Sequence, residues 1–308
     1  MNIVVFDTET TDLEKPFCYN VGYVIFDTTT NTKVVKRDFV VEQVWHNIEL
    51  FQSAYYAEKR PLYVGRLRAR TATLDKWGYI MQRMRRDLKQ FDVEHGFAQN
   101  AEFDERVFEY NCDWFKTMNP LDELIVHDIR GHVCEAIADT QAYKDFCDNA
   151  SANKIASLIS QIDITTVGKN GNIRAKTQSE LDREKRKIIE TVEAEWFTEA
   201  GNYSTTAQTI YRYLINDEDY DEEHTAMADA DIECDILCAC VQNGCAWNAD
   251  YKKPSIVRHV PRTFVVIDKN GVSHSFDYTA KKKIPHDGGV RLYEQTPPQS
   301  VPNPTANP

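Results

Sequence analysis

The first 45 residues alternate apolar, strand-forming stretches with turn residues. Residues 3–6 are a short apolar run, residues 20–27 are rich in valine and aromatic side chains, and residues 33–41 contain four valines and a phenylalanine. A threonine- and asparagine-rich turn at 27–32 separates the second stretch from the third. Short apolar runs bounded by turn residues predict strands. The pattern therefore predicts an antiparallel three-stranded meander at the start of an α/β domain.

The pattern changes to helical spacing after this meander. From about 46 to 92, large apolar residues recur every three or four positions, namely Leu74, Trp77, Ile80, Met81, Met84, Leu88 and Phe91. Strands are then predicted at 96–98 and 124–129, and helices at 102–112 and 133–146. Alternating strands and helices predict a mixed central sheet with helices on both faces.

Residues from about 150 to 200 differ in character and are interpreted as an insertion. The sequence Lys169-Asn170-Gly171-Asn172 predicts the tight turn of a hairpin over 162–175. A charged helix is expected over 179–197 with Ser179 as its N-cap. Two more helices are predicted, at 204–214 and 225–243.

The chain becomes extended and turn-rich towards its C-terminal end. We expect residues 1–249 to form one domain that includes the insertion, and residues 250–295 to form an extension with a β-hairpin at 263–278. Residues 296–308 contain five prolines and little apolar surface, so this tail is predicted to be disordered.

The formal charge of −12 argues against a protein that holds nucleic acid by long-range attraction. Any polyanion is expected to be held locally, by divalent ions and a few basic residues. A sequence-specific duplex-binding protein is disfavoured for the same reason.

No stretch is apolar and long enough to predict a membrane span, and Met1–Phe6 is typical of a buried strand rather than a signal peptide. We therefore expect a cytoplasmic protein whose eight cysteines are reduced thiols. Four of them cluster between Cys234 and Cys245. Their spacing lacks paired C-x2-C knuckles, which favours packing of a helix face over the alternative, a zinc site.

Asp7 and Glu9 directly follow the first predicted strand. Because side chains alternate along an extended backbone, both carboxylates are expected to point the same way. Paired carboxylates provide the hard oxygen ligands that Mg²⁺ and Mn²⁺ prefer. Taken alone, the pair is also explained as a polar strand end solvated by water.

Two further segments place acids near the ends of predicted elements. Residues 96–104 predict a strand that ends at Asn100 and a helix with Asp104 in its first turn. A helix that starts near His224 puts Asp229 about one turn in, among small apolar residues, where an unpaired carboxylate is costly. Each acid taken singly is also explained by the preference of acids for helix N-termini.

Together, the Asp-x-Glu on a strand, the Asn-x3-Asp between strand and helix, and the His-x4-Asp on a later helix resemble the DEDD exonuclease superfamily. The resemblance is to its histidine (DEDDh) branch, which includes polymerase proofreading exonucleases and oligoribonucleases. It covers roughly residues 1–146 and 198–245, with the motifs in the expected order. It implies a ribonuclease H-like α/β fold, whose mixed sheet starts with an antiparallel meander and is flanked by helices.

The family's four acids carry over to Asp7, Glu9, Asp104 and Asp229, and its general base to His224. The resemblance implies a 3′→5′ exonuclease in which two Mg²⁺ or Mn²⁺ ions, roughly 4 Å apart, clamp the attacking and leaving oxygens. Asp7 would bridge both ions. Glu9 and Asp229 would complete the nucleophile side, and Asp104 would hold the other ion through water. His224 would accept a proton from the attacking water.

The residues around the motifs are expected to bind substrate. Thr10 and Leu13 would contact the terminal nucleotide, and Asn100 would place the substrate or order its loop. Two positions depart from the family pattern. Asp12 stands where a glycine is frequent, which affects loop shape, and Gln99 stands where a histidine commonly precedes the asparagine.

Other side chains leave alternatives open. Phe17 and Tyr19 either stack on bases or belong to the core, and Arg66, Arg68 and Arg70 either follow phosphates or form a solvated loop face.

The expected substrate is the 3′ end of single-stranded nucleic acid, with DNA favoured over RNA. The alternatives are an exoribonuclease or oligoribonuclease with the same chemistry, or a non-catalytic module that docks a replication or repair protein through residues 251–308. We expect no membrane partner.

Overall fold

The computed structural model describes residues 1–167, 172–258, 262–267, 273–278, 282–284 and 292–294. The chain forms two compact units, each built from two stretches of sequence. The first unit contains residues 1–140 and 205–254, and the second contains residues 141–204 and the described residues from 255 onward.

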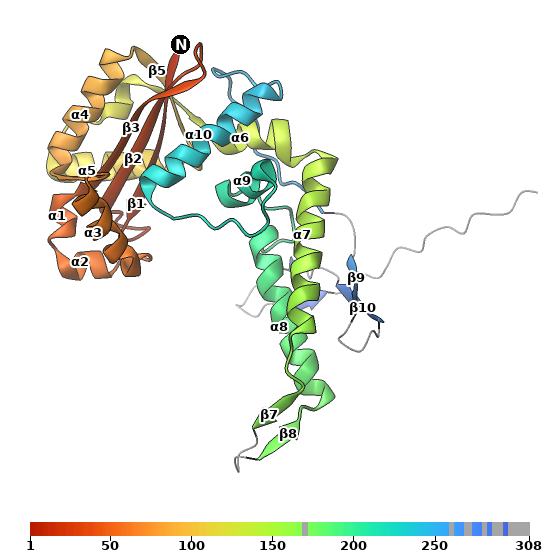
Figure 1. Ribbon diagram of the computed structural model, residues 1–308. Coiled ribbons are helices and arrows are strands. Elements are labelled where there is room, and N and C mark those ends of the chain that lie inside the picture. The colour runs from red at the N-terminus through yellow and green to blue at the C-terminus, as the bar shows by residue number, and fades with distance from the viewer. Residues whose placement is uncertain (168–171, 259–261, 268–272, 279–281, 285–291, 295–308) are drawn as a thin grey trace, which may run out of the picture. The chain divides into compact units, whose positions relative to one another are not determined.

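The first unit is built around a six-stranded sheet with the strand order β4-β3-β2-β1-β5-β6 (Figure 1). Strand β2 runs antiparallel to β1 and β3, and all other neighbours are parallel. The strands are β1 (Asn2–Thr10), β2 (Cys18–Asp27), β3 (Thr32–Val41), β4 (Thr73–Asp75), β5 (Val93–Ala98) and β6 (Ile125–Asp128). The predicted α/β class, the mixed sheet and the opening meander are confirmed.

The helices of this unit follow from the apolar spacing of the sequence. They are α1 (Glu42–Trp45), α2 (Ile48–Gln52), α3 (Arg60–Ala69), α4 (Trp77–Gln90), α5 (Ala101–Phe115), α6 (Ile129–Val133), α9 (Ala207–Ile215) and α10 (Ala226–Gln242). Single turns of other helix types complete the list, η1 (Ala57–Lys59), η2 (Pro120–Glu123) and η3 (Cys134–Ala138).

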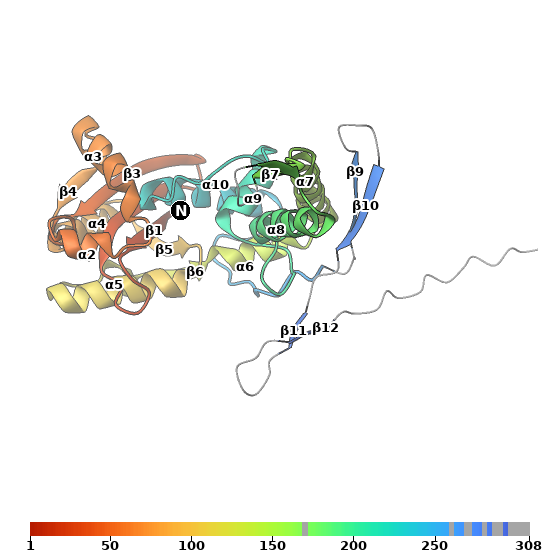
Figure 2. The same ribbon diagram turned by 90° about the horizontal axis from the view of Figure 1, so that it is seen from below.

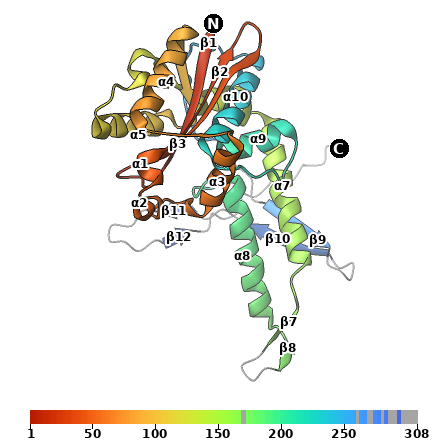
Figure 3. The ribbon, with the colours of Figure 1, turned by 60° about the vertical axis from the view of Figure 1, so that its left-hand side comes forward.

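Helices cover both faces of the sheet, and the alternation of side chains along β2 shows which face each helix covers. The Tyr23 hydroxyl donates a hydrogen bond of 3.0 Å to Asp87 of α4. The neighbouring Gly22 points to the other face and touches the backbone of Ala226, the first residue of α10. Helices α4 and α5 therefore lie on one face and α10 on the other, as Figures 1 and 3 show.

The second unit is dominated by α7 (Gln141–Ser160) and α8 (Gln178–Trp196), which lie side by side (Figure 2). The short strands β7 (Thr165–Val167) and β8 (Ile173–Ala175) pair antiparallel between them, which confirms the predicted hairpin. Its turn at 168–171 lies outside the described residues.

Helix α8 begins one residue before its predicted start, and its cap differs from the expected one. The expectation that Ser179 caps this helix is wrong. Thr177 is the N-cap, and it forms a capping box with Glu180, because the Thr-x-x-Glu spacing lets each side chain bond the backbone N–H of the other.

The C-terminal extension contains two pairs of strands. Strands β9 (Arg262–Ile267) and β10 (Ser273–Tyr278) pair antiparallel, as the sequence predicts, and β11 (Lys282–Ile284) pairs with β12 (Leu292–Glu294). The tail at 296–308, predicted to be disordered, lies outside the described residues.

Two sequence-based predictions in the first half of the chain need correction. The single helix predicted over 133–146 is instead divided near Thr140, whose backbone N–H and hydroxyl both bond the carbonyl of Ile137. Helix α7 then starts at Gln141 and runs on to Ser160. Within the region interpreted as helical at 46–92, the edge strand β4 was missed because only three residues pair with β3.

Along the described residues, no helix combines the length and the apolar character that a bilayer crossing requires.

We predict that Gly22→Ala destabilises the first unit. A Cβ atom at this position would lie 2.1 Å from the Ala226 carbonyl carbon, so β2 and α10 would have to separate. The expected loss is about 3 kcal/mol of unfolding free energy, at the upper end of the usual cost of overpacking. Urea unfolding followed by circular dichroism measures it.

Gly65→Ala is the matched control. Gly65 lies inside α3, and a Cβ there would meet no atom within 4 Å. This change should stabilise the protein by about 0.5–1 kcal/mol through helix propensity. Equal effects of the two substitutions would contradict the close approach of β2 and α10.

Candidate metal centre

Three carboxylates from β1 and α10 meet on the α10 face of the sheet. Asp7 and Glu9 lie in the second half of β1, and Asp229 lies in the first turn of α10. One carboxylate oxygen of each residue can be chosen so that all three oxygens lie within 4.8 Å of one another. The described residues contain one such group. These are three of the acids that the sequence predicts to share a site, and the structure brings them together.

The position of Asp229 depends on how α10 is fixed to β2. The buried Asn20 accepts hydrogen bonds at its side-chain oxygen from the Ala226 N–H (2.9 Å) and the Tyr63 hydroxyl (3.1 Å). Its amide nitrogen donates to the Asp38 carboxylate (2.7 Å) and the Phe39 carbonyl (2.9 Å). Asn20 therefore satisfies an N–H at the start of the helix and ties that helix to the sheet.

A second connection holds the segment just before the helix. The Arg66 guanidinium pairs with Asp38 at 2.7 Å and with Glu223 at 2.6 Å, and its side chain is only 19% exposed. Because Glu223 immediately precedes His224, this arginine anchors the segment that carries the proposed base. Of the basic run, Arg68 and Arg70 are the exposed members.

Asp104 approaches from the opposite face of the sheet. It lies in the first turn of α5 and is 2% exposed, and its Oδ1 accepts a hydrogen bond of 2.7 Å from the Thr8 hydroxyl. Thr8 points away from Asp7 and Glu9 because neighbouring side chains of a strand alternate. Asp104 therefore lies outside the group of three oxygens but beside it. Its charge is the strongest single charge effect on the pKa of Asp7.

The electrostatics of this cluster are unfavourable for four ionised acids. Burial raises the pKa of Glu9 to about 8, that of Asp104 to about 7 and that of Asp229 to about 9. Burial, followed by the charges of the neighbouring acids, also raises the pKa of Asp7 well above its usual range. Carboxylates crowded in this way retain protons unless a cation compensates their charge.

The donor set fits hard divalent cations. All the ligand atoms are carboxylate oxygens, the type that Mg²⁺ and Mn²⁺ prefer. Asp229 is one of the three acids of the cluster, and its Oδ1 is buried without a hydrogen-bond partner among the described residues. Such an atom is costly unless something binds it.

His224 directly precedes Thr225, the N-cap of α10, and has a strained backbone conformation with φ of +49°. Its ring stacks on Tyr56 with ring centroids 4.8 Å apart, and its Nδ1 lies 3.5 Å from the Glu222 carboxylate. Burial, then the positive charge of Lys59, lowers the pKa of His224. The imidazole is therefore neutral near pH 7, as a general base must be.

Lys59 also belongs to this site, although no sequence motif pointed to it. Its ammonium donates to the Glu223 carbonyl at 2.5 Å and lies 4.6 Å from the centroid of the Tyr56 ring. Its charge opposes the upward pKa shifts of Glu9 and Asp229. No motif spacing connects residue 59 to the acids, so only tertiary structure identifies it.

Glu233 is a fifth buried acid that the motifs did not include. It follows Asp229 by four residues and therefore shares its helix face. Its Oε2 accepts a hydrogen bond of 3.2 Å from the Gln99 N–H. Burial, then the charges of Asp104 and Asp229, raises its pKa well above the usual value. Helical spacing from Asp229 was the signal that could have identified it.

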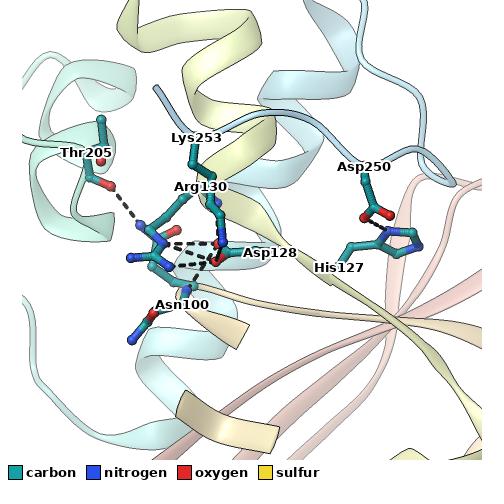
Figure 4. Close-up of polar contacts among 8 residues, drawn as sticks. Asn100, His127, Asp128, Arg130, Thr205, Asp250 and Lys253 are labelled. Carbon is teal, nitrogen blue, oxygen red and sulfur yellow. Dashed lines mark hydrogen bonds and ion pairs between the residues drawn. The ribbon is translucent and has the colours of Figure 1, made fainter. Parts of the chain in front are cut away.

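The expected substrate residues lie around the ends of β1 and β5. Thr10 donates a hydrogen bond to the Asp12 carbonyl (3.2 Å), and Leu13 is 71% exposed. Asn100 adopts the left-handed conformation at the N-cap of α5. Its backbone N–H lies 3.3 Å from the Asp128 carboxylate, on which Arg130 and Lys253 also converge (Figure 4).

The two aromatic candidates near β1 pack against protein. Tyr19 is fully buried, with its ring against Phe51 and its hydroxyl 3.3 Å from the Glu9 carboxylate. Phe17 packs edge-on against Trp114. The core interpretation therefore holds for Tyr19, which also orients a proposed metal ligand.

No protein-family model matches this chain, and no curated protein matches it either.

We predict that millimolar Mn²⁺ raises the melting temperature by several degrees, because a ligand that binds only the folded state stabilises it. Asp7→Ala should abolish the shift, since it removes an acid from the cluster. Differential scanning fluorimetry measures both. Asp113→Ala, at an exposed position of α5, is the control and should retain the shift. An equal shift in all three proteins would contradict the site.

In the presence of EDTA, we expect the stability of the folded protein to depend on pH through Glu9. Between pH 4.5 and about 8, folded Glu9 keeps a proton that the unfolded chain releases, so stability falls as pH rises through this window. Glu9→Gln removes this loss. Its melting temperature relative to the native protein should therefore rise from pH 4.5 to 8 and then level off.

Melting curves at half-unit pH steps test this expectation, with the exposed Glu109→Gln as the control. A Glu9→Gln difference that stays constant across the window would show that burial does not penalise the ionised form.

Proposed function

We propose that this protein is a two-metal-ion 3′→5′ exonuclease that releases nucleoside monophosphates from single-stranded DNA ends. The observation that carries the proposal is the meeting of Asp7, Glu9 and Asp229 within 4.8 Å, with Asp104 beside them. These are the four acids that the resemblance to DEDDh exonucleases selects from the sequence. Phosphodiester hydrolysis needs such a cation-binding cluster to offset negative charge on the phosphate.

The strand order supports the same proposal. The order β3-β2-β1-β5-β6, in which only β2 is antiparallel to β1, is compatible with a ribonuclease H-like fold. In that fold we place the catalytic centre at the end of β1, between α5 and α10.

In the proposed reaction, the clustered acids bind the metal ions and neighbouring hydroxyls orient those acids. Asp7, Glu9, Asp229 and Asp104 would hold two Mg²⁺ or Mn²⁺ ions, which supply Lewis acidity and charge neutralisation at the phosphate. The Thr8 hydroxyl orients Asp104, and the Tyr19 hydroxyl orients Glu9.

His224 would accept the proton of the attacking water. Its Nδ1 faces Glu222, so Nε2 is the atom assigned to receive that proton. The lowered pKa of His224, caused mainly by burial, keeps the imidazole unprotonated at neutral pH.

The substrate end is assigned to the surface around β1. Thr10, Leu13 and Asn100 are proposed to contact the terminal nucleotide, with Leu13 offering exposed apolar surface to a base or sugar. DNA remains the favoured substrate, with RNA as the alternative for the same chemistry. A replication or repair protein is the proposed partner.

The prediction is a ladder of products shortened from the 3′ end. A 5′-labelled single-stranded DNA and an RNA of the same sequence are incubated with the protein and Mg²⁺ or Mn²⁺. Asp7→Ala and Asp229→Asn should give no ladder because the ion cluster is incomplete. His224→Ala should slow the reaction about 10²- to 10⁴-fold, the usual contribution of a general base.

Melting curves of each variant confirm that loss of activity is not loss of fold. The faster substrate decides between DNA and RNA. If the folded native protein degrades neither substrate, the exonuclease proposal fails and a non-catalytic binding module takes its place.

A further inference from the structure

The outward face of α4 concentrates positive charge on a protein whose formal charge is −12. Its apolar residues pack inward, and Arg83, Arg85, Arg86 and Lys89 occupy the other sides of the helix. Lys76 precedes the helix. Arg37 of β3 lies next to the helix because it pairs with Asp87, the residue that also pairs with Arg83. We call these six residues the α4 basic face.

Four acids lie in this region, Asp75, Asp87, Asp92 and Glu123, so they neutralise only part of the charge of six cations. Asp87, the one acid within α4, is buried and is paired with Arg37 (3.0 Å) and Arg83 (3.2 Å). The nearest acid to Arg85 is Glu123, at 3.8 Å and 81% exposed, a pair that solvent screens strongly. Arg86 and Lys89 are exposed.

The surface around this face is hollowed on three sides. Hollows of about 540, 570 and 410 Å³ adjoin it, and all three are lined in part by Gln82. Arg85 lines the first two, and Arg86 lines the second and third. Arg85 and Arg86 therefore each line two neighbouring hollows, so they can contact a chain that passes from one hollow to the next.

An exposed aromatic side chain suited to stacking, and an exposed methionine, accompany the charge. Tyr79 is 61% exposed and lines the first and third hollows. Met118 is 63% exposed, lines the first hollow, and its sulfur lies 3.1 Å from an Arg85 nitrogen. Cations along a groove combined with stacking platforms are the features that hold single strands without reading their sequence.

We infer that the α4 basic face binds single-stranded nucleic acid, at a surface separate from the carboxylate cluster. Phosphates would lie on Arg85, Arg86 and Lys89, and a base would stack on Tyr79. Four of the six cations are arginines, whose planar fork matches phosphate geometry. That the strand bound at α4 is also the strand degraded rests on the proposed exonuclease function.

The test measures binding without turnover. A fluorescent (dT)30 is titrated in EDTA with the native protein and with a triple variant, Arg85→Glu/Arg86→Glu/Lys89→Glu, at several salt concentrations. The triple variant should bind at least tenfold more weakly at low salt. Its log–log salt slope should become shallower by about 2, since about 0.7 is lost for each phosphate contact removed. Tyr79→Ala should weaken binding but leave the salt slope unchanged.

The matched control reverses three exposed cations of α8, Arg183→Glu/Arg186→Glu/Lys187→Glu. It changes the net charge by the same amount and should leave binding within about twofold, apart from long-range effects that vanish as salt rises. Circular dichroism and melting temperature verify that both triple variants are folded.

Unchanged binding in the α4 variant, or equal weakening in the α8 variant, would overturn the inference. Competition by polyglutamate as effective as that by unlabelled (dT)30 would also overturn it and would indicate an acidic polypeptide as the occupant. Because the titration measures no cleavage, it can detect strand binding at α4 even if the protein has no exonuclease activity. Conversely, activity with unaltered binding by the α4 variant would refute only this inference.

Discussion

The close approach of α10 to β2 is the contact on which the rest of the candidate site depends. Gly22 has no side chain, so the backbone of Ala226 rests directly against the strand. Asn20, two residues earlier on β2 and fully buried, receives the helix N–H. Together these two residues define where the first turn of α10 lies. That turn is the one that brings Asp229 to the acids of β1.

The acids that this contact brings together destabilise one another's ionised forms. Burial favours the protonated forms of Glu9, Asp104 and Asp229, whose pKa values all rise, and the buried Glu233 adds another acid. A fold without a use for cations would gain stability by replacing some of these acids with apolar residues. Their retention in one cluster is physically reasonable when cation binding recovers the cost. Lys59 supplies a fixed partial compensation at the edge of the cluster.

Local patterns predicted the parts of the fold that local chemistry determines. The meander, the paired acids of β1 and the helix carrying Asp229 all follow from alternation, turn residues and helical spacing. The three-residue β4 has too little pattern to be identified, and the break at Thr140 depends on which hydroxyl bonds which carbonyl.

In the candidate site, too, local sequence patterns predicted only the residues that lie within the motifs. Asp7, Glu9 and Asp229 were identified because motif spacing places them on known elements. Lys59 and Arg66 lie far from the motifs in sequence, and only the tertiary packing of η1 and α3 brings them to the segment before α10. Asp104 was identified by its motif. The sequence did not indicate that the Thr8 hydroxyl would hold it on the other side of the sheet.

The division of β1 between two faces has a consequence for how the protein folds. Asp7 and Glu9 face α10, whereas Thr8 faces Asp104 of α5, so each side chain is useful only in one pairing register with β2. A slip of one residue would replace the two acids on the α10 face by Thr8 together with either Phe6 or Thr10. Misregistered molecules would thus remain compact yet have no cation cluster. Cation binding therefore reports, in a single signal, whether β1 has paired with β2 in the correct register.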